Sequence, residues 1–301
     1  YCNGIGVLWI KKSRGKRESV MQGIAYWIEK RALINPYRIA VITETEQLTY
    51  KELAEKIAAA AHYLHNERKV KKGDRIAILS QNRLEYITLL FAIAKLECIA
   101  VPLNIRLNVH ELIYQLKDSG TSLLIAEETF YPMAQSIQEE IGTSLLPIEL
   151  FNKLDPIDGP FDTGEVDEQA PYIICYTSGT TGKPKGAVLT QSNMYWNALN
   201  NILALDITSK DRSIVLLPLF HIGGIGLFAY PTLFVGGTIV IPGRFDPKKA
   251  IEMIEKHQVT IVMGVPSIHQ ALYHSPNFTT ANLSSVRWFY SGGAPGAREL
   301  I

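Results

Sequence analysis

Short apolar segments alternate with longer segments of helical period from Met21 onward, and this alternation limits the fold more than any other feature of the sequence. Residues 75–79 have the apolar character of a buried strand, and residues 84–96 have the length and period of a helix. Thr49 and Glu52 form a capping-box pair before another helical segment. Strands that alternate with helices of this length are typical of parallel sheets. We therefore predict an α/β fold with mainly parallel sheets flanked by helices in two subdomains.

The same pattern predicts the remaining elements. Further strands are expected at residues 98–101, 122–126, 172–176, 213–217, 238–241, 260–263 and 286–290. Further helices are expected at residues 111–116, 192–203, 227–234, 247–256 and 266–274.

Residues 152–170 interrupt the pattern because they are rich in Asp, Gly and Pro. This composition favours a surface connector. It divides the chain into two predicted α/β subdomains, residues 21–151 and residues 171–301, the second of which is expected to be incomplete.

The two ends of the sequence carry expectations of their own. Residues 1–20 have a local excess of Lys and Arg, and we interpret them as a disordered or non-native extension before a natural start at Met21. Residues 298–301 have no cap or turn and resemble the beginning of a helix. We expect the chain to be a fragment of a longer protein.

Composition excludes several classes of protein. Lys plus Arg is 30 and Asp plus Glu is 29, so the net charge of +1 gives no overall attraction to nucleic acid or to an anionic membrane. Three cysteines lie far apart without a CxxC pair, which argues against a disulfide framework or a zinc site. No apolar window of the sequence reaches the length of a transmembrane helix. The expected location is the reducing cytoplasm.

The segment that indicates a chemistry is residues 176–186, Tyr-Thr-Ser-Gly-Thr-Thr-Gly-Lys-Pro-Lys-Gly. It follows a predicted strand and precedes a predicted helix, where α/β proteins place phosphate-binding loops. Its three glycines allow close backbone approach, its hydroxyls add donors, and Lys183 and Lys185 supply positive charge. Only two residues separate Gly179 from Gly182, so the segment is not a Walker A loop. It predicts a polyphosphate site.

This run, YTSGTTGKPKG, resembles the signature of the AMP-forming acyl-CoA synthetases, the adenylate-forming family that includes luciferases and the adenylation domains of peptide synthetases. Three further segments agree with the resemblance. They are Pro102-Leu103-Asn104, Leu217-Pro218-Leu219-Phe220-His221 and Ser291-Gly292-Gly293-Ala294-Pro295. The resemblance extends over residues 21–301 and corresponds to the N-terminal portion of the family's fold.

The resemblance implies a reaction in two steps. A carboxylate attacks the α-phosphate of MgATP to give an acyl-adenylate and pyrophosphate, and the thiol of coenzyme A then displaces AMP to give a thioester. ATP, Mg²⁺ and coenzyme A as co-substrate are therefore the implied cofactors. The residues implied to bind ATP are Thr177, Ser178, Gly179, Thr180, Thr181, Gly182, Lys183, Gly292, Gly293, Ala294 and Pro295.

The resemblance also assigns catalytic and metal-binding candidates. Lys183 and Lys185 would neutralise the leaving pyrophosphate, and the hydroxyl of Thr177 would contact Mg²⁺. From the residues alone, a histidine such as His221 beside an apolar segment is usually structural. The resemblance instead implies that His221 lies where the acyl carboxylate meets the adenylate.

Several parts of the family pattern are absent from the sequence, among them a later acidic Mg²⁺ ligand, a ribose-binding Asp and the small C-terminal domain with its catalytic Lys. We therefore expect that the 301-residue chain does not complete thioester formation by itself.

The substrate and the exact function stay open between alternatives. The apolar, glycine-containing residues 221–228 favour a fatty or aromatic acid–CoA ligase, with a succinylbenzoate-type ligase as the nearest variant. An amino-acid adenylation domain of a peptide synthetase is the first alternative. Such a domain usually has an acidic partner for the substrate amine, and the absence of Asp and Glu from residues 213–245 counts against it. A non-catalytic nucleotide-binding remnant is the second. The expected partner is a small-molecule carboxylate, with the protein acting alone or as a homodimer.

Overall fold

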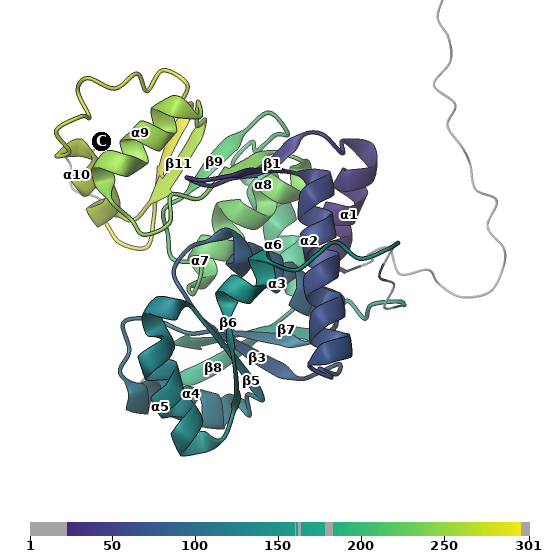
Figure 1. The fold of residues 1–301 in the computed structure, drawn as a ribbon. Coiled ribbons are helices and arrows are strands. Elements are labelled where there is room, and N and C mark those ends of the chain that lie inside the picture. The colour runs from purple at the N-terminus through teal and green to yellow at the C-terminus, as the bar shows by residue number, and fades with distance from the viewer. Residues whose placement is uncertain (1–22, 160, 162–163, 178–182, 296–301) are drawn as a thin grey trace, which may run out of the picture.

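The structure is a computed structural model that describes residues 23–159, 161, 164–177 and 183–295. The predicted extension at residues 1–20 and the last residues from 296 lie outside this description. The described chain forms two six-stranded sheets with helices between them and on their outer faces (Figure 1). The predicted α/β class, with mainly parallel sheets, is confirmed.

The first sheet, which lies lower in Figure 1, has the strand order β6-β5-β3-β4-β7-β8. Neighbouring strands are parallel except for β7 and β8, which form an antiparallel hairpin. The strands are β3 (Arg75–Leu79), β4 (Ile99–Pro102), β5 (Leu123–Ala126), β6 (Ser144–Pro147), β7 (Pro171–Thr177) and β8 (Lys185–Thr190).

The second sheet, which lies higher in Figure 1, has the strand order β12-β11-β9-β10-β1-β2. Here β1 and β2 are antiparallel and the other neighbours are parallel. The strands are β1 (Ile39–Ile42), β2 (Gln47–Thr49), β9 (Arg212–Val215), β10 (Thr238–Val240), β11 (Ile261–Gly264) and β12 (Trp288–Ser291).

The helices form three layers around these sheets. Helices α2, α3 and α6 lie between the sheets, α4 and α5 cover the outer face of the first sheet, and α9 and α10 cover that of the second (Figure 1). The α-helices are α1 (Ala25–Ile34), α2 (Tyr50–His62), α3 (Leu84–Lys95), α4 (Val109–Ser119), α5 (Tyr131–Ile141), α6 (Gln191–Ala204), α7 (Ile222–Gly224), α8 (Tyr230–Val235), α9 (Pro247–Lys256) and α10 (Pro266–Tyr273). Shorter 3₁₀ or π segments are η1 (Tyr63–Glu67), η2 (Glu128–Phe130), η3 (Ile148–Asn152) and η4 (Ile225–Ala229).

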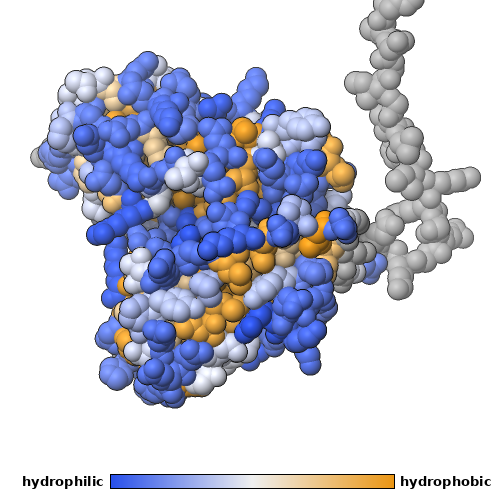
Figure 2. Space-filling model, in the orientation of Figure 1, coloured by the Kyte–Doolittle hydropathy of each residue, from blue (hydrophilic) through white to orange (hydrophobic). Residues whose placement is uncertain are grey.

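Helix α3 occupies the centre of the molecule, and every residue of it except Lys95 is buried. Residues on alternate sides of a strand contact different layers: Ile76 and Ile78 of β3 join the central core, whereas Ala77 and Leu79 pack under α4 and α5. Figure 2 shows a mostly hydrophilic face, with its apolar side chains mainly along the middle of the molecule. One core therefore joins the two sheets.

The division of the chain between the sheets differs from the predicted subdomains. Strands β1 and β2 precede residues 152–170 but belong to the second sheet, and β7 and β8 follow these residues but belong to the first sheet. Residues 21–151 and 171–301 are therefore not the two sheet units. The reason is that hydrophobic period indicates which segments are strands, but it carries no information on long-range pairing.

A second difference concerns the glycine-rich segment. We expected a helix after it, but β8 lies between the segment and α6, so the segment joins the two strands of a hairpin. Helix α6 itself begins after a capping box in which the Thr190 hydroxyl accepts from the Asn193 N–H at 3.1 Å.

Candidate functional site

A cleft lies where the carboxyl ends of strands from both sheets meet. Its larger part has a volume of about 510 Å³ and its smaller part about 400 Å³. The first sheet contributes residues that follow β3 and β4, and the second sheet contributes residues that follow β9 and β10. Loops at the carboxyl ends of parallel strands are the usual position of ligand sites in α/β folds. The position of the cleft therefore makes it the first candidate for a substrate site.

The glycine-rich segment begins at the carboxyl end of β7, in the same sheet. Thr177 pairs with Lys185 across the hairpin, and both residues are exposed together with Lys183. The predicted phosphate-binding residues Ser178, Gly179, Thr180, Thr181 and Gly182 lie outside the described residues. The structure thus gives the two ends of the segment, and these ends present a hydroxyl and two ammonium groups to solvent.

Helix α4 holds both ends of this segment through tyrosine hydroxyls. Tyr176 Oη donates to Asp118 Oδ2 at 2.6 Å, and Tyr114 Oη donates to the carbonyl oxygen of Pro184 at 3.2 Å. Burial and the hydrogen bond to the Asp118 carboxylate raise the pKa of Tyr176 above its ordinary value. The Tyr176 hydroxyl therefore stays protonated and remains a donor near neutral pH.

Gly186 has a different role from the one expected. A Cβ atom at this position would lie 2.7 Å from Ile174 Cγ2 and 3.3 Å from Tyr176 Cζ. The absent side chain thus leaves space for the Tyr176 ring across the hairpin, where Tyr176 pairs with Gly186. Gly186 serves packing of the hairpin.

His221 is exposed and immediately precedes α7. Its Nδ1 accepts from the Gly223 N–H at 3.1 Å. Since Nδ1 is an acceptor, the proton of the neutral ring is on Nε2, which is then available as a donor. Gly224 permits this arrangement, because a Cβ there would lie 2.2 Å from the carbonyl oxygen of Pro218.

The predicted adenine-side loop follows β12. Gly293 has φ +83°, a conformation that a side chain disfavours, while Gly292, Ala294 and Pro295 complete the turn. A Cβ on Gly292 would lie 3.4 Å from Met263 Cε. Met263 also lines a cavity of only about 10 Å³ together with Gly223 and Gly224. The structure therefore brings the loop after β12 and the His221 segment to the same end of β11.

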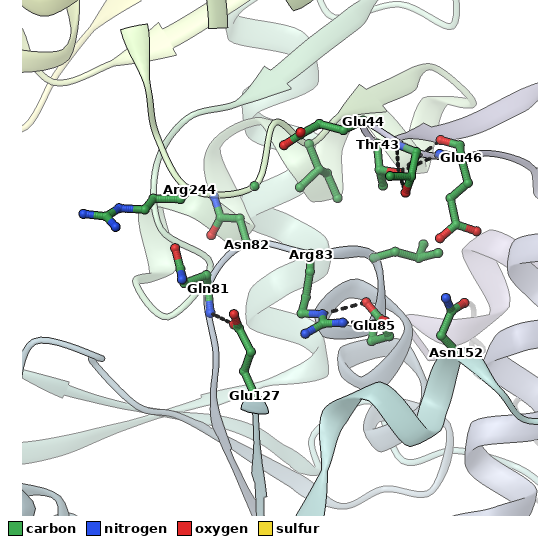
Figure 3. Close-up of a pocket in the computed structure, with 14 residues that line it drawn as sticks. Thr43, Glu44, Glu46, Gln81, Asn82, Arg83, Glu85, Glu127, Asn152 and Arg244 are labelled. Carbon is green, nitrogen blue, oxygen red and sulfur yellow. Dashed lines mark hydrogen bonds and ion pairs between the residues drawn. The ribbon is translucent and has the colours of Figure 1, made fainter. Parts of the chain in front are cut away.

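Among the cleft residues that the sequence did not predict are Asn82, Arg106 and Arg244. Figure 3 shows Arg244 on the side of Gln81 and Asn82 that faces away from Glu44 and Glu46. Arg106 and Arg244 are exposed, and no ion pair of either side chain occurs among the described residues. The only sequence signal for these residues was their position three to five residues after predicted strands.

The described residues contain no group of three or more His, Cys, Asp or Glu side chains that could hold a metal ion. Mg²⁺ commonly uses one or two protein oxygens together with substrate phosphates. The exposed hydroxyl of Thr177 fits such a role as a single oxygen ligand beside a nucleotide.

Cys98 and Cys175 are free thiols, and burial raises their pKa values to about 12 and about 11. Neither thiol is a thiolate at neutral pH, which makes both poor nucleophiles.

Residues 28–301 match the family of AMP-binding enzymes. The chain belongs to this family. A feruloyl-CoA synthase from Amycolatopsis sp. is 37% identical over 279 residues, which are 93% of this chain and 56% of that protein. A 2-succinylbenzoate–CoA ligase from Bacillus subtilis is 34% identical over 278 residues, which are 91% of this chain and 54% of that protein. The chain thus spans about half the length of the curated relatives it matches.

Solved structures agree with this membership. The N-terminal domain of FACL13 from Mycobacterium tuberculosis has a TM-score of 0.85 at 28% identity, covering 93% of this chain and 72% of that one. The o-succinylbenzoate CoA synthetase from Bacillus subtilis, in complex with its acyl-adenylate intermediate, has a TM-score of 0.81 at 33% identity, covering 91% and 55%. The resemblance to AMP-forming acyl-CoA synthetases is confirmed, and these relatives do not favour the amino-acid adenylation alternative.

None of the helices in the described part of the chain is long and apolar enough to cross a membrane.

Proposed function

We propose that this chain is the nucleotide-binding part of an ATP-dependent acid–CoA ligase. The observation that carries the proposal is the complete signature at residues 176–186, which joins two strands at the carboxyl edge of a sheet and presents Lys183 and Lys185 to solvent. Fixed positive charge at this position would stabilise the pyrophosphate that leaves when a carboxylate attacks the α-phosphate.

The site residues form two groups, one for the phosphates of ATP and one for the acyl carboxylate, which are the two anions that must react. Residues 177–183 and Lys185 would hold the phosphates of ATP, with Mg²⁺ at the Thr177 hydroxyl neutralising their charge when bound. Gly292, Gly293, Ala294 and Pro295 would lie against the adenine. The Nε2–H of His221 would donate to an oxygen of the carboxylate or of the adenylate formed from it. Holding these groups in place would lower the barrier in addition to the electrostatic stabilisation of the leaving pyrophosphate.

For the acid, we propose a compact aromatic carboxylate in preference to a long-chain fatty acid. The space behind the His221 segment is a cavity of about 10 Å³ that Phe228 and Met263 line. The Phe228 ring also packs on Tyr290, with ring centroids 5.1 Å apart. A long alkyl chain would need this packed cluster to open, whereas a flat ring needs a smaller displacement.

For the thiol substrate, the cleft offers features that suit coenzyme A. Its larger part combines apolar side chains such as Ile105, Phe130 and Phe220 with the guanidinium groups of Arg106 and Arg244. Arginine binds phosphate groups through paired donors, and the apolar surface suits an uncharged arm. We therefore place the coenzyme in this cleft.

The experiment is product analysis by mass spectrometry with the full-length protein, ATP, Mg²⁺, coenzyme A and a panel of acids. The panel contains hydroxycinnamates, benzoates, succinylbenzoate, fatty acids of several lengths and amino acids. We expect an acyl-CoA and equimolar AMP with an aromatic acid. Aminoacyl-adenylate without any acyl-CoA would contradict the proposal and support the amino-acid alternative.

A substitution at Phe228 tests the proposed class of acid. Phe228→Ala removes the ring that fills the acyl side of the site, so we expect activity with medium-chain fatty acids to rise relative to aromatic acids. Tyr273→Phe, an exposed substitution on α10, is the control and should leave the preference unchanged. An unchanged preference in Phe228→Ala would place the acyl group elsewhere.

A further inference from the structure

Asn82 lies at the junction of the two sheets and makes three hydrogen bonds across it. It follows β3 of the first sheet, and its side chain bonds the chain that leaves β9 of the second sheet. Asn82 Nδ2 donates to the carbonyl oxygens of Leu217 at 2.9 Å and Val215 at 3.2 Å. Asn82 Oδ1 accepts from the Leu219 N–H at 2.7 Å. The side chain thus satisfies three backbone groups of a segment more than 130 residues away.

The backbone around Asn82 is held from the opposite side. Glu127 Oε2 accepts from the Gln81 N–H at 2.8 Å and from the Ser80 hydroxyl at 2.9 Å. The next residue, Arg83, pairs with Glu85 at 2.8 Å and with Glu149. Figure 3 shows the Gln81–Glu127 and Arg83–Glu85 contacts below Asn82. Asn82 is therefore attached to a fixed support, as a positioning group must be.

The contacts continue from this segment to His221. The His221 N–H donates to the carbonyl oxygen of Pro218 at 3.1 Å, and the Gly224 N–H donates to the carbonyl oxygen of His221 at 2.9 Å. Gly224 also packs so closely on the Pro218 carbonyl that no side chain fits between them. A displacement of Pro218 would therefore move His221 with it. Pro218 lies between the two residues that Asn82 bonds most closely, Leu217 and Leu219.

We propose that Asn82 is a positioning residue that fixes the 217–221 segment and so sets where the His221 imidazole lies relative to the acyl carboxylate. This inference rests on the proposed function, because the proposed function supplies the acyl carboxylate that His221 would bind. An asparagine suits the position since it offers a donor and an acceptor at once, whereas Asp lacks the donors and Leu lacks both. In the adenylation step Asn82 touches no reacting group and acts through His221.

The experiment compares Asn82→Ala with a matched control, Gln191→Ala. Gln191 is also a buried amide that bridges distant segments: its Oε1 accepts from the Ile24 N–H at 2.8 Å, and its Nε2 donates to the carbonyl oxygen of Ala94 at 2.9 Å. It lines neither part of the cleft. Both substitutions remove buried hydrogen bonds, so both should lower the melting temperature by several degrees.

Only the Asn82 variant should change the chemistry with the acid. In carboxylate-dependent ATP–pyrophosphate exchange by the full-length protein, we expect Asn82→Ala to lower kcat/KM for the acid about tenfold or more, with KM for ATP within about twofold of wild type. Gln191→Ala should keep both constants. A fall in Asn82→Ala no larger than that in Gln191→Ala, or an equal loss toward ATP, would overturn the proposal.

A second readout does not depend on activity. The ¹⁵N shifts of the His221 ring report its tautomer and hydrogen bonding, and they should move in Asn82→Ala and in the milder Asn82→Ser but not in Gln191→Ala. Unchanged ring shifts in a folded Asn82→Ser protein would overturn the positioning role. Absence of exchange by wild type would instead contradict the proposed function, so the two failures are distinguishable.

Discussion

At two glycines near the candidate site, Gly186 and Gly224, a side chain would clash with other atoms of the protein. The absence of a side chain there serves packing and does not make space for a ligand. At Gly186 the space is taken by Ile174 and Tyr176 of the neighbouring strand. At Gly224 it is taken by the backbone of Pro218, which cannot move aside as a flexible side chain could. The geometry of the site therefore depends on backbone packing at these single positions.

The first prediction concerns Gly224→Ala. The added Cβ would lie 2.2 Å from the carbonyl oxygen of Pro218, so the His221 segment must shift. We expect a loss of about 1–3 kcal/mol in the free energy of unfolding and at least about a tenfold fall in adenylation rate. Gly142→Ala is the control: it lies in open space with φ +69° after α5, and should lose about 1 kcal/mol with full activity. Full activity in Gly224→Ala would show that the close packing of Gly224 on Pro218 does not position His221.

The second prediction concerns pH and Asp211. Burial alone would raise the pKa of this carboxyl, but hydrogen bonds from Arg287, Thr260 and Thr208 hold it below its ordinary value. Arg287 binds it through two contacts of 2.9 Å. Because the folded pKa is the lower one, the resulting stability is present above about pH 4 and is lost as the pH falls through the folded pKa.

Asp211→Asn should therefore lower the free energy of unfolding by about 2 kcal/mol at pH 7, as expected for a hydrogen-bonded charge pair. Urea unfolding at a series of pH values should show that the difference in the free energy of unfolding between wild type and variant decreases below about pH 4. A difference in the free energy of unfolding that stays constant from pH 7 to about pH 3 would mean that the charge of Asp211 does not contribute to stability.

At the scale of elements, helix α4 supports the β7–β8 hairpin, which we propose binds phosphate. Its Tyr114 and Asp118 lie one turn apart and bond the two ends of the segment, at Pro184 and Tyr176. We infer that the helix fixes the backbone next to Lys183 and Lys185 and so helps to set the positions of these two side chains.

The third prediction follows from this support. Tyr114→Phe removes only the hydroxyl that bonds Pro184, so we expect KM for ATP to rise about three- to tenfold with little change in KM for the acid. The measurement is ATP–pyrophosphate exchange at varied ATP, with Tyr273→Phe as the surface control. An unchanged KM for ATP would show that α4 does not position the segment.

The elements also show how far the sequence leads. Strand β3 and helix α9 have the predicted bounds. The signal for β3 is a continuous apolar run, and the signal for α9 is a proline followed by apolar residues at helical spacing; both signals are local in the sequence. Strand β8 was missed because its six residues, Lys185–Thr190, are exposed or half-buried and show no apolar alternation. The residues that resemble the family signature were found, but Asn82 was not, since its role depends on a segment of the other sheet.

At the scale of the whole molecule, the two sheets share one hydrophobic core. The buried Tyr172 of β7 and Tyr230 of α8 hydrogen-bond each other between the sheets, and the Tyr172 hydroxyl also donates to the carbonyl oxygen of Leu90 at 2.9 Å. Because strands from both halves of the sequence enter each sheet, neither half can complete a sheet alone.

The fourth prediction is that the two sheets unfold together. Tyr230→Phe should lower the free energy of unfolding by about 1–2 kcal/mol without splitting the transition, while Tyr37→Phe at an exposed position should leave it unchanged. Fluorescence and circular dichroism during urea unfolding are the measurements. Two separate transitions would contradict a shared core.

The proposed function requires that residues 176–186 and His221 belong to one site that joins ATP to a carboxylate. The most direct test is carboxylate-dependent ATP–pyrophosphate exchange by the full-length protein, compared among wild type, Lys183→Ala and His221→Ala. We expect exchange by wild type with an aromatic acid, and a fall of about a hundredfold when either residue is replaced. Folded wild-type protein that exchanges with no acid of the panel, or variants that exchange as fast as wild type, would contradict it.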